Sequence, residues 1–504
     1  GIHVTDYAVE RRQKRMIIRC SNPECDFHGD KYGLPIHLVD ETIYAHVPTF
    51  IVATVDKFAQ IPMKEEPAAL FGISNGKRPP ELIIQDELHL IAGPLGTMTG
   101  LYEAAVTTLC GRDGIPVKII ASTATIRNAD KQIRALYGRR HVQFPPQGIS
   151  IEDSFFAVES TKEEKPERLY LGVMGAGLTA TTTLIRMNAA MLFATRYLRS
   201  RGFSDEVIDN FWTITNYFNT LRELGSTNTH IRDNVISRYE YLTETKFRGV
   251  YDGEHMDIPN DNIIELTSRV DNEKVMQYIQ KDLLEPYRSE GNPDALSFVL
   301  ASNMMSVGID VGRLGAMIVN NQPKTSAEYI QATSRIGRKN PGLVAICYNQ
   351  SRSRDRSHYE QFLNYHATLY RHVEASSLTP FSDRARDRGL HAVYISLCRY
   401  LCAGMLPNEA ASEYQKDAEK FRKIDEIILN YVDAVDPGEK DHVRKELEDI
   451  KAEWELRKRD ENLVYKSYGE HDLLKKDIEQ NRFRTMNSMR NVDGQSMVYL
   501  LWRQ

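Results

Sequence analysis

Short runs of apolar and β-branched residues recur along the chain and predict the strands of parallel sheets. Runs of this length between turn-forming residues are typical of buried strands. The runs are 50–55, 81–85, 117–122, 211–216, 263–269, 296–302, 316–320 and 343–347. Helical segments separate them, including 98–110 and a helix after residue 320. Strands that alternate with helices favour parallel sheets with right-handed crossovers, so the pattern predicts an α/β fold.

The hydrophobic pattern also divides the chain into parts. Residues 151–167 are polar and charged and are expected to form a linker. Residues 410–468 place apolar residues at helical spacing among charged ones, which predicts long exposed helices. We therefore expect an N-terminal segment, an α/β domain, the linker, a second α/β domain and a mainly helical C-terminal module. Their expected bounds are 1–48, 49–150, 151–167, 168–350 and 351–504.

Composition and charge exclude several classes of protein. The chain has 504 residues, of which 41% are apolar and 26% charged, as in an ordinary soluble protein. Six cysteines do not make a disulfide framework, and free thiols suit a reducing cytoplasm. No apolar run is long enough to span a bilayer and no signal peptide is present, so we expect a cytoplasmic protein without a membrane partner.

A net charge of −5 argues against a uniformly basic nucleic-acid coat. Binding to nucleic acid would have to use local patches, such as Arg352, Arg354 and Arg356 with the nearby Tyr359. Basic residues among aromatic ones can grip phosphates and stack on bases. Asp355 can equally neutralise these arginines locally, and both readings remain open.

Cys20, Cys25 and His28 are candidate zinc ligands in the N-terminal segment. Their side chains are of the types that structural zinc sites use, but such sites normally have four ligands and a fourth is not obvious. The alternative is a turn with two free thiols.

Two carboxylates follow the run at 81–85, within the sequence DELH. Asp86 and Glu87 would lie at the carboxyl end of a parallel strand, where open α/β sheets bind ligands. A hard oxygen ligand for Mg²⁺ next to a general base is what nucleotide hydrolysis requires. We expect Asp86 to hold the metal, with Glu87 as a second ligand and the group that activates water.

Arginines are concentrated after the run at 316–320, in the sequence QATSRIGR. A helix is expected to carry Gln331, Arg335 and Arg338 on adjoining turns, downstream of a tight turn at Gly308 and Asp310. Guanidinium groups match phosphate oxygens in two places, so this arrangement suits an anionic ligand. A solvated helix face is the alternative for the arginines alone.

DELH and QATSRIGR together resemble motifs of the superfamily 2 helicases. The resemblance implies two RecA-like parallel-sheet domains, with ATP and Mg²⁺ held by the DExH element and the arginines of the second domain reaching the phosphates. It also implies that His89 relays the nucleotide state and that Gly308 and Asp310 link the nucleotide to the nucleic-acid path.

Further residues acquire expected roles from the same resemblance. Thr123 and Thr125 resemble a Ser-Ala-Thr motif that hydrogen-bonds to the DExH element. Thr54 and Lys57 resemble an element that contacts the phosphates of one nucleic-acid strand, although a strand end capped by Asp56 explains them equally well. Arg127 and Arg269 are weaker candidates for such contacts.

Several segments narrow the resemblance to the DrmA-like helicase subunits of the DISARM anti-phage defence system. These segments are 51–58, 86–100, 304–338, 354–360, 377–382 and 488–492. The resemblance implies an ATP-driven helicase or translocase acting on single-stranded DNA or on duplex DNA with an overhang. It also implies a partner subunit with a DUF1998-type domain.

The sequence departs from the helicase pattern in one respect, because it contains no G-x-x-x-x-G-K-S/T. The backbone amides and lysine of that loop hold nucleotide phosphates. The first residue is Gly1, so a preceding segment that carries the loop is the simplest explanation. A degenerate ATPase is the other, and the chain would then be a catalytically silent, nucleic-acid-binding scaffold that recruits a partner.

Overall fold

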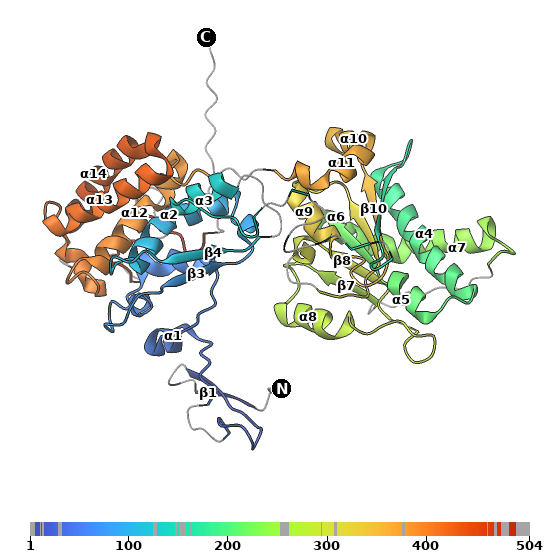
Figure 1. The fold of residues 1–504 in the computed structure, drawn as a ribbon, viewed down its shortest axis with the longest axis horizontal. Helices are drawn as coiled ribbons and strands as arrows, with labels where there is room; N and C mark the ends of the chain where they lie inside the picture. Colours follow the sequence, from blue (N-terminus) through green and yellow to red (C-terminus); the bar gives the residue numbers. More distant parts are fainter. Residues whose placement is uncertain are drawn as a thin grey trace, which may run out of the picture. The chain divides into compact units, whose positions relative to one another are not determined.

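The chain forms two compact units (Figure 1). Unit 1 comprises residues 1–142 and 375–504, and unit 2 comprises residues 143–374. The computed structural model describes residues 6–10, 12, 15–28, 33–123, 129–146, 149–150, 155, 158, 160–161, 163–251, 262–293, 295–306, 310–374, 378–460, 462–467, 471–474 and 483–489. Eight of the 17 residues of the expected linker, 151–167, lie outside these residues. None of the described helices combines the length and the apolar character needed to cross a membrane.

A two-stranded parallel sheet lies at the centre of the first part of unit 1. Strands β3 (Leu82–Gln85) and β4 (Lys118–Ala121) pair in register from Leu82 opposite Lys118 to Gln85 opposite Ala121. Helix α2 (Gly93–Cys110) connects them, and α3 (Ala129–Tyr137) follows β4. The two predicted strands and the predicted helix are therefore confirmed, although α2 begins five residues before residue 98.

The N-terminal segment of unit 1 contains a two-stranded sheet and a short helix. Strands β1 (Tyr7–Glu10) and β2 (Arg15–Ile18) pair antiparallel, and α1 (Asp40–His46) follows them. The predicted strand at 50–55 is wrong. Residues 51–54 have no regular structure and pair with no other strand of the described chain, and a 3-10 helix, η3 (Val55–Met63), begins where the strand should end. The apolar side chains of residues 50–52 are exposed rather than buried, and Val52 is 83% exposed.

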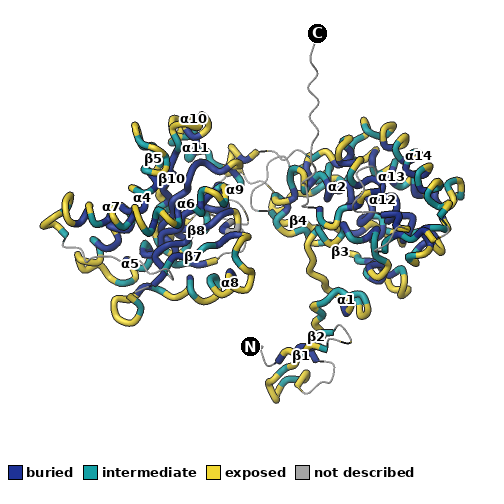
Figure 2. Tube along the Cα trace, turned by 180° about the vertical axis from the view of Figure 1, so that it is seen from behind, coloured by how far each residue is buried: buried dark blue, intermediate teal, exposed yellow. Residues whose placement is uncertain are grey.

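The C-terminal helices share one core with α2. Helices α12 (Asp383–Leu401), α13 (Glu419–Val435) and α14 (Lys440–Arg457) confirm the helical C-terminal region. Figure 2 shows α2 and α12 as buried tubes, with the exposed positions on the outer faces of α13 and α14. Helix α12 approaches α2 closely at Gly389, where a Cβ atom would lie 2.9 Å from Leu101 Cδ2. The helices therefore complete unit 1, and only residues 375–504 of the expected C-terminal module belong to it.

Unit 2 is built on a six-stranded, wholly parallel sheet with the order β5-β10-β9-β6-β8-β7. Its strands are β5 (Arg168–Met174), β6 (Ile214–Phe218), β7 (Ile263–Leu266), β8 (Phe298–Ala301), β9 (Ala316–Asn320) and β10 (Gly342–Tyr348). Central strands such as β6 are buried at every position, as expected for a parallel sheet covered on both faces. The α/β fold class is confirmed, and β5 is a strand that the sequence pattern did not reveal.

The helices of unit 2 lie between these strands in the chain, as the pattern predicts, except for the last two, which follow β10. They are α4 (Ala180–Ser200), α5 (Asp205–Trp212), α6 (Leu221–His230), α7 (Ile236–Tyr241), α8 (Asn272–Gln277), α9 (Ser326–Thr333), α10 (Ser353–Glu360) and α11 (Phe362–Ala367). The strand predicted from residue 211 starts too early, because Phe211 and Trp212 end α5. Residues 351–374 stay with unit 2 rather than with the C-terminal helices. Asp355 contributes to this by accepting the backbone N–H groups of Asn349 and Gln322 at 3.0 and 3.2 Å.

The shared core of unit 1 predicts the effect of truncating one α12 side chain. Leu390 is fully buried in α12, so Leu390→Ala should lower the free energy of unfolding by about 2–5 kcal/mol. Leu456→Ala in α14, where the side chain is 51% exposed, serves as the control and should cost less than about 1 kcal/mol. Chemical denaturation measures both. Equal costs would contradict a core shared by α12 and α2.

The buried carboxyl group of Glu103 on α2 predicts a pH dependence of stability. Burial raises its pKa to about 8, and Arg139 opposes that shift. The group is protonated in the folded protein at pH values where the unfolded chain ionises. Its contribution to stability is therefore complete below about pH 4.5 and is lost as pH rises through 8.

Glu103→Gln keeps a neutral side chain at every pH and should remove this loss. Relative to the wild type, the variant should become more stable by up to a few kcal/mol as pH rises from 5 to 9, measured by chemical denaturation at each pH. The exposed Glu426→Gln on α13 is the control. A stability difference for Glu103→Gln that does not change with pH would contradict the prediction.

Candidate functional site

The chain turns sharply after β3, and this turn places Asp86 and Glu87. Glu87 has a left-handed backbone conformation (φ 49°, ψ 49°), which is uncommon for a residue with a side chain. Its N–H donates to Asp86 Oδ1 at 2.9 Å, and Ser122 Oγ donates to the same oxygen at 2.5 Å. Strained conformations of this kind are concentrated at functional sites. The corner therefore fixes one Asp86 oxygen and leaves the Glu87 side chain 39% exposed.

His89 joins this corner to the residues after β4. Its Nδ1 lies 3.2 Å from Thr123 Oγ1 and 3.4 Å from Glu87 Oε2, and its side chain is 8% exposed. The β3–β4 pairing brings the two segments together, since Ser122 N donates to Gln85 O at 2.9 Å. The hydrogen bond expected between the Ser-Ala-Thr-like element and DELH is confirmed at Thr123. Thr125 and Arg127 lie outside the described residues.

In unit 2, the residues after α9 form a loop of residues 334–338, which we call the arginine loop. Helix α9 starts at the N-cap Thr325, whose Oγ1 accepts the N–H of Glu328 at 3.2 Å, and it ends at Thr333. The expectation that Arg335 and Arg338 lie on the helix with Gln331 is therefore wrong. Gln331 is on the last turn and is buried, whereas both arginines follow it in the loop.

Gly337 determines the path of this loop. It has φ +65°, its N–H donates to Leu314 O at 2.9 Å, and a Cβ atom there would lie 2.7 Å from Gly342 Cα. A side chain is therefore excluded both by conformation and by contact. The turn directs Arg338 to Asp310, with which it forms an ion pair. The structure thus brings together Asp310 and Arg338, two of the site residues predicted from the sequence. Gly308 lies outside the described residues.

A pocket of about 490 Å³ adjoins the arginine loop within unit 2. Its lining residues are Lys165, Pro166, Arg168, Ser334, Gly337 and Arg338. Three of these side chains are cationic, which suits an anionic ligand. The residues before and at the start of β5 were not identified from the sequence as part of a site.

The candidate nucleic-acid contacts are paired with carboxylates where they are described. Lys57 Nζ lies 2.8 Å from Asp40 Oδ2 in unit 1, and Arg269 Nη2 lies 2.9 Å from Glu265 Oε1 in unit 2. Thr54 is exposed and precedes η3 without a side-chain capping bond. All three remain accessible, because Lys57 and Arg269 are each 47% exposed.

The proposed zinc ligands share one turn, in which the His28 N–H donates to Cys25 O at 2.8 Å. His28 Nδ1 lies 3.0 Å from the carbonyl oxygen of Cys20, so this ring nitrogen faces the backbone. Across the described part of the chain, no group of three or more His, Cys, Asp or Glu side chains has the arrangement of a metal site. Cys20, Cys25 and His28 thus form a turn with two free thiols, the alternative reading of the sequence.

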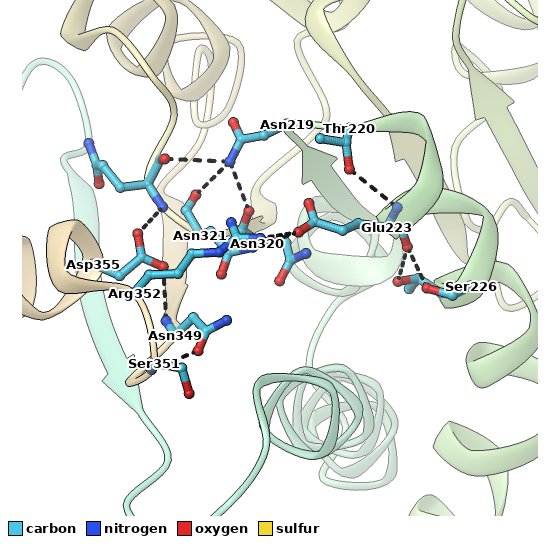
Figure 3. Close-up of polar contacts among 12 residues, drawn as sticks. Asn219, Thr220, Glu223, Ser226, Asn320, Asn321, Asn349, Ser351, Arg352 and Asp355 are labelled. Atoms are coloured by element: carbon cyan, nitrogen blue, oxygen red, sulfur yellow. Dashed lines mark hydrogen bonds and ion pairs between the residues drawn. The ribbon is translucent and has the colours of Figure 1, made fainter. Parts of the chain in front are cut away.

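Sequence reasoning missed a polar cluster at the carboxyl ends of β6, β9 and β10 (Figure 3). Asn219 follows β6, and its Nδ2 lies 3.2 Å from Asn320 O and 3.4 Å from Asn321 O and Gln322 O. Asn321 is buried and has φ +64°. Polar residues directly after buried strands were the available signal, because these positions share one edge of a parallel sheet.

Two arginines of the 352–356 patch have different partners in the structure. Arg352 pairs with Glu223 on the first turn of α6 at 2.7 Å and stays 49% exposed. Arg354 instead donates to the carbonyl oxygens of Pro323 and Lys324 at 2.5 and 2.7 Å. Arg352 forms its ion pair with Glu223, while burial raises the pKa of Asp355 and the charges of Arg352 and Arg354 oppose that shift.

Comparison with known proteins shows which proteins the chain resembles. A family model described as the helicase conserved C-terminal domain matches residues 262–340. The chain is 37% identical over 531 residues to the DISARM protein DrmA of Bacillus paralicheniformis (strain ATCC 9945a / NCIMB 11709 / CD-2), and the match covers 96% of this chain. The chain spans 46% of the length of that relative.

Two solved helicase structures align with part of the chain at 15% identity. The DUF1998 helicase MrfA bound to DNA and AMPPNP covers 68% of this chain and is itself covered to 40%, with a TM-score of 0.45. The Mycobacterium smegmatis helicase Lhr bound to ssDNA and AMP-PNP covers 74% and is covered to 42%, with a TM-score of 0.44.

The DrmA match and the helicase family model show that the chain resembles the superfamily 2 helicases. Within that superfamily it resembles the DISARM protein DrmA over nearly all of its 504 residues. The resemblance first indicated by DELH and QATSRIGR is thereby confirmed.

The close approach at Gly337 predicts how the arginine loop responds to a methyl group. Gly337→Ala should destabilise unit 2 by more than the roughly 1–2 kcal/mol expected from the left-handed conformation alone, because its Cβ would meet Gly342. Gly177→Ala is the matched control, with φ +71° and open space around the added atom. Chemical denaturation compares the two, and equal costs would contradict the contact.

Proposed function

We propose that this protein is an ATP-driven DNA helicase or translocase of bacterial anti-phage defence. The observation that carries the proposal is the corner after β3, where Asp86, Glu87 and His89 are held in fixed relation to Ser122 and Thr123. The arginine loop of unit 2 supports it, because Arg335 and Arg338 follow directly after α9 beside a cationic pocket.

The chain's own residues fit Mg²⁺ and a nucleotide. Two carboxylates at one corner suit Mg²⁺, which is commonly bound through one or two carboxylates while it keeps several waters. When bound, the metal would neutralise charge on the phosphate oxygens. Asp86 would hold it, and Glu87 would take the proton from the attacking water, since its side chain reaches solvent. Arg335 and Arg338 would stabilise charge on the transferred phosphoryl group.

The nucleic-acid substrate and the partner are part of the proposal. Thr54, Lys57 and Arg269 are accessible for contacts to the phosphates of single-stranded DNA or of a duplex with an overhang. The relative DrmA is a DISARM protein, and this similarity supports a role of the present protein in a defence system. A partner subunit with a DUF1998-type domain is the expected companion.

One observation favours a second candidate. The 504 residues contain no G-x-x-x-x-G-K-S/T, and a nucleotide site built from these residues alone would lack that lysine's contact to the nucleotide phosphates. A helicase-like scaffold that binds nucleic acid and recruits a partner without hydrolysing ATP would need no such loop. The intact DELH corner weighs against this candidate.

Steady-state ATP hydrolysis by the full-length protein tests the proposal, with and without single-stranded DNA. DNA should stimulate turnover, and Glu87→Gln should lower kcat by about 10²–10⁴-fold while ATP still binds, because the general base is lost. Glu81→Gln is the control, since the Glu81 side chain is 71% exposed and forms an ion pair with Arg78.

The two candidates give different results. Turnover that depends on Glu87 supports the motor. Bound DNA without turnover, even after the partner subunit is added, would overturn the motor and favour the scaffold. Turnover that survives Glu87→Gln unchanged would contradict the role given to Glu87.

A further inference from the structure

We infer that Arg168, at the start of β5, is a positioning residue for the arginine loop. The inference deepens the proposed function, because that loop carries Arg335 and Arg338. Nothing in the sequence pattern singles out Arg168, which precedes the loop by well over a hundred residues. The contacts of its guanidinium group make the assignment.

Arg168 binds the backbone of the loop directly. Its Nε donates to Ile336 O at 2.7 Å, and its Nη2 donates to Ser334 O at 3.4 Å. The guanidinium is planar and rigid, so one side chain fixes the orientation of two peptide groups. Carbonyl groups beyond a helix end have no partner within the helix and must find one elsewhere. Arg168 supplies it where α9 ends.

The Ser334 carbonyl connects Arg168 to Arg338. The same oxygen that accepts Arg168 Nη2 also accepts Arg338 Nε at 3.4 Å, and Arg338 pairs with Asp310. A change in the direction of this carbonyl therefore changes the position of the Arg338 side chain. Arg168 acts on Arg338 through one shared atom, without touching it.

A second residue of β5 supports the same end of α9. Tyr170 lies on the same face of the strand as Arg168, because side chains alternate along a strand. Its hydroxyl lies 3.1 Å from Thr333 Oγ1 and 3.5 Å from Arg168 Nη1. The last helical residue and the loop are thus held from one strand.

Backbone contacts also hold the loop. Gly337 N donates to Leu314 O, and Gly337 packs against Gly342 at the start of β10. Gly342 N in turn donates to Glu167 O at 3.2 Å, the residue before Arg168. Removing Arg168 would leave this backbone support and take away the two bonds to Ser334 and Ile336.

Arg313 provides a matched control for a purely structural arginine. It also donates to a backbone carbonyl, Leu283 O at 2.8 Å, and it binds Asp209 and Thr213 at 2.9 and 3.0 Å. Among the described residues, Arg313 forms no hydrogen bond or ion pair with the arginine loop. Arg313→Ala should therefore lower the stability of unit 2 without changing that loop.

The experiment compares Arg168→Ala, Arg168→Lys and Arg313→Ala in the full-length protein. Arg168→Ala should lower kcat for ATP by roughly 10²-fold while KM stays within about threefold, because misplaced arginines affect the reacting state most. Arg168→Lys, which can keep one of the two carbonyl bonds, should recover part of the loss. Arg313→Ala should leave kcat within about twofold of the wild type.

Hydrogen exchange of the amides in residues 334–338 gives a readout that needs no turnover. Exchange should become faster in Arg168→Ala and stay unchanged in Arg313→Ala. Faster exchange in Arg168→Ala supports the role of Arg168 even in a protein that fails to hydrolyse ATP. The test of Arg168 is therefore separate from the test of the proposed function. Unchanged exchange in Arg168→Ala, or the same change in both alanine variants, would overturn it.

Discussion

The parallel pairing of β10 with both β5 and β9 is the constraint on which unit 2 depends. β10 pairs with β5 along its whole length from Gly342 to Tyr348, and with β9 on its other side. β10 thereby joins the edge strand β5 to β9, the strand that precedes α9. Because Gly342 starts β10 beside Gly337, the same pairing sets the distance between the sheet and the arginine loop. The backbone of the arginine loop is therefore held in place by the sheet.

The sequence predicted those features that depend on contiguous residues. Seven of the eight predicted strand runs overlap observed strands, since buried parallel strands are short and almost wholly apolar. DELH and QATSRIGR could also be found because each is a run of contiguous residues. The run at 50–55 was misjudged because a strand also requires a partner, which no local pattern reports. The end of α9 was misjudged because Gly337 binds Leu314 and Gly342 rather than continuing the turns of the helix.

Residues that act on distant backbone groups were beyond sequence reasoning. Arg168 contacts carbonyl oxygens of Ser334 and Ile336, and any residue type can supply a carbonyl oxygen. Asn219 binds the backbone after β9 in the same way. Such contacts become visible only when the order of the strands is known. The division into units was similarly hidden, because the apolar faces of α2 and α12 fit each other across nearly three hundred residues of sequence.

The fixed carboxylate of Asp86 has a consequence for ion selectivity. Its Oδ1 already accepts two hydrogen bonds, from Ser122 Oγ and from the Glu87 N–H, so its two lone pairs are engaged. A cation at this corner would meet one Asp86 oxygen rather than both. Ca²⁺ gains much of its affinity from bidentate carboxylates in a flexible shell, whereas Mg²⁺ accepts single oxygens and keeps its waters. The corner after β3 is thus better suited to the smaller, more strongly hydrated ion.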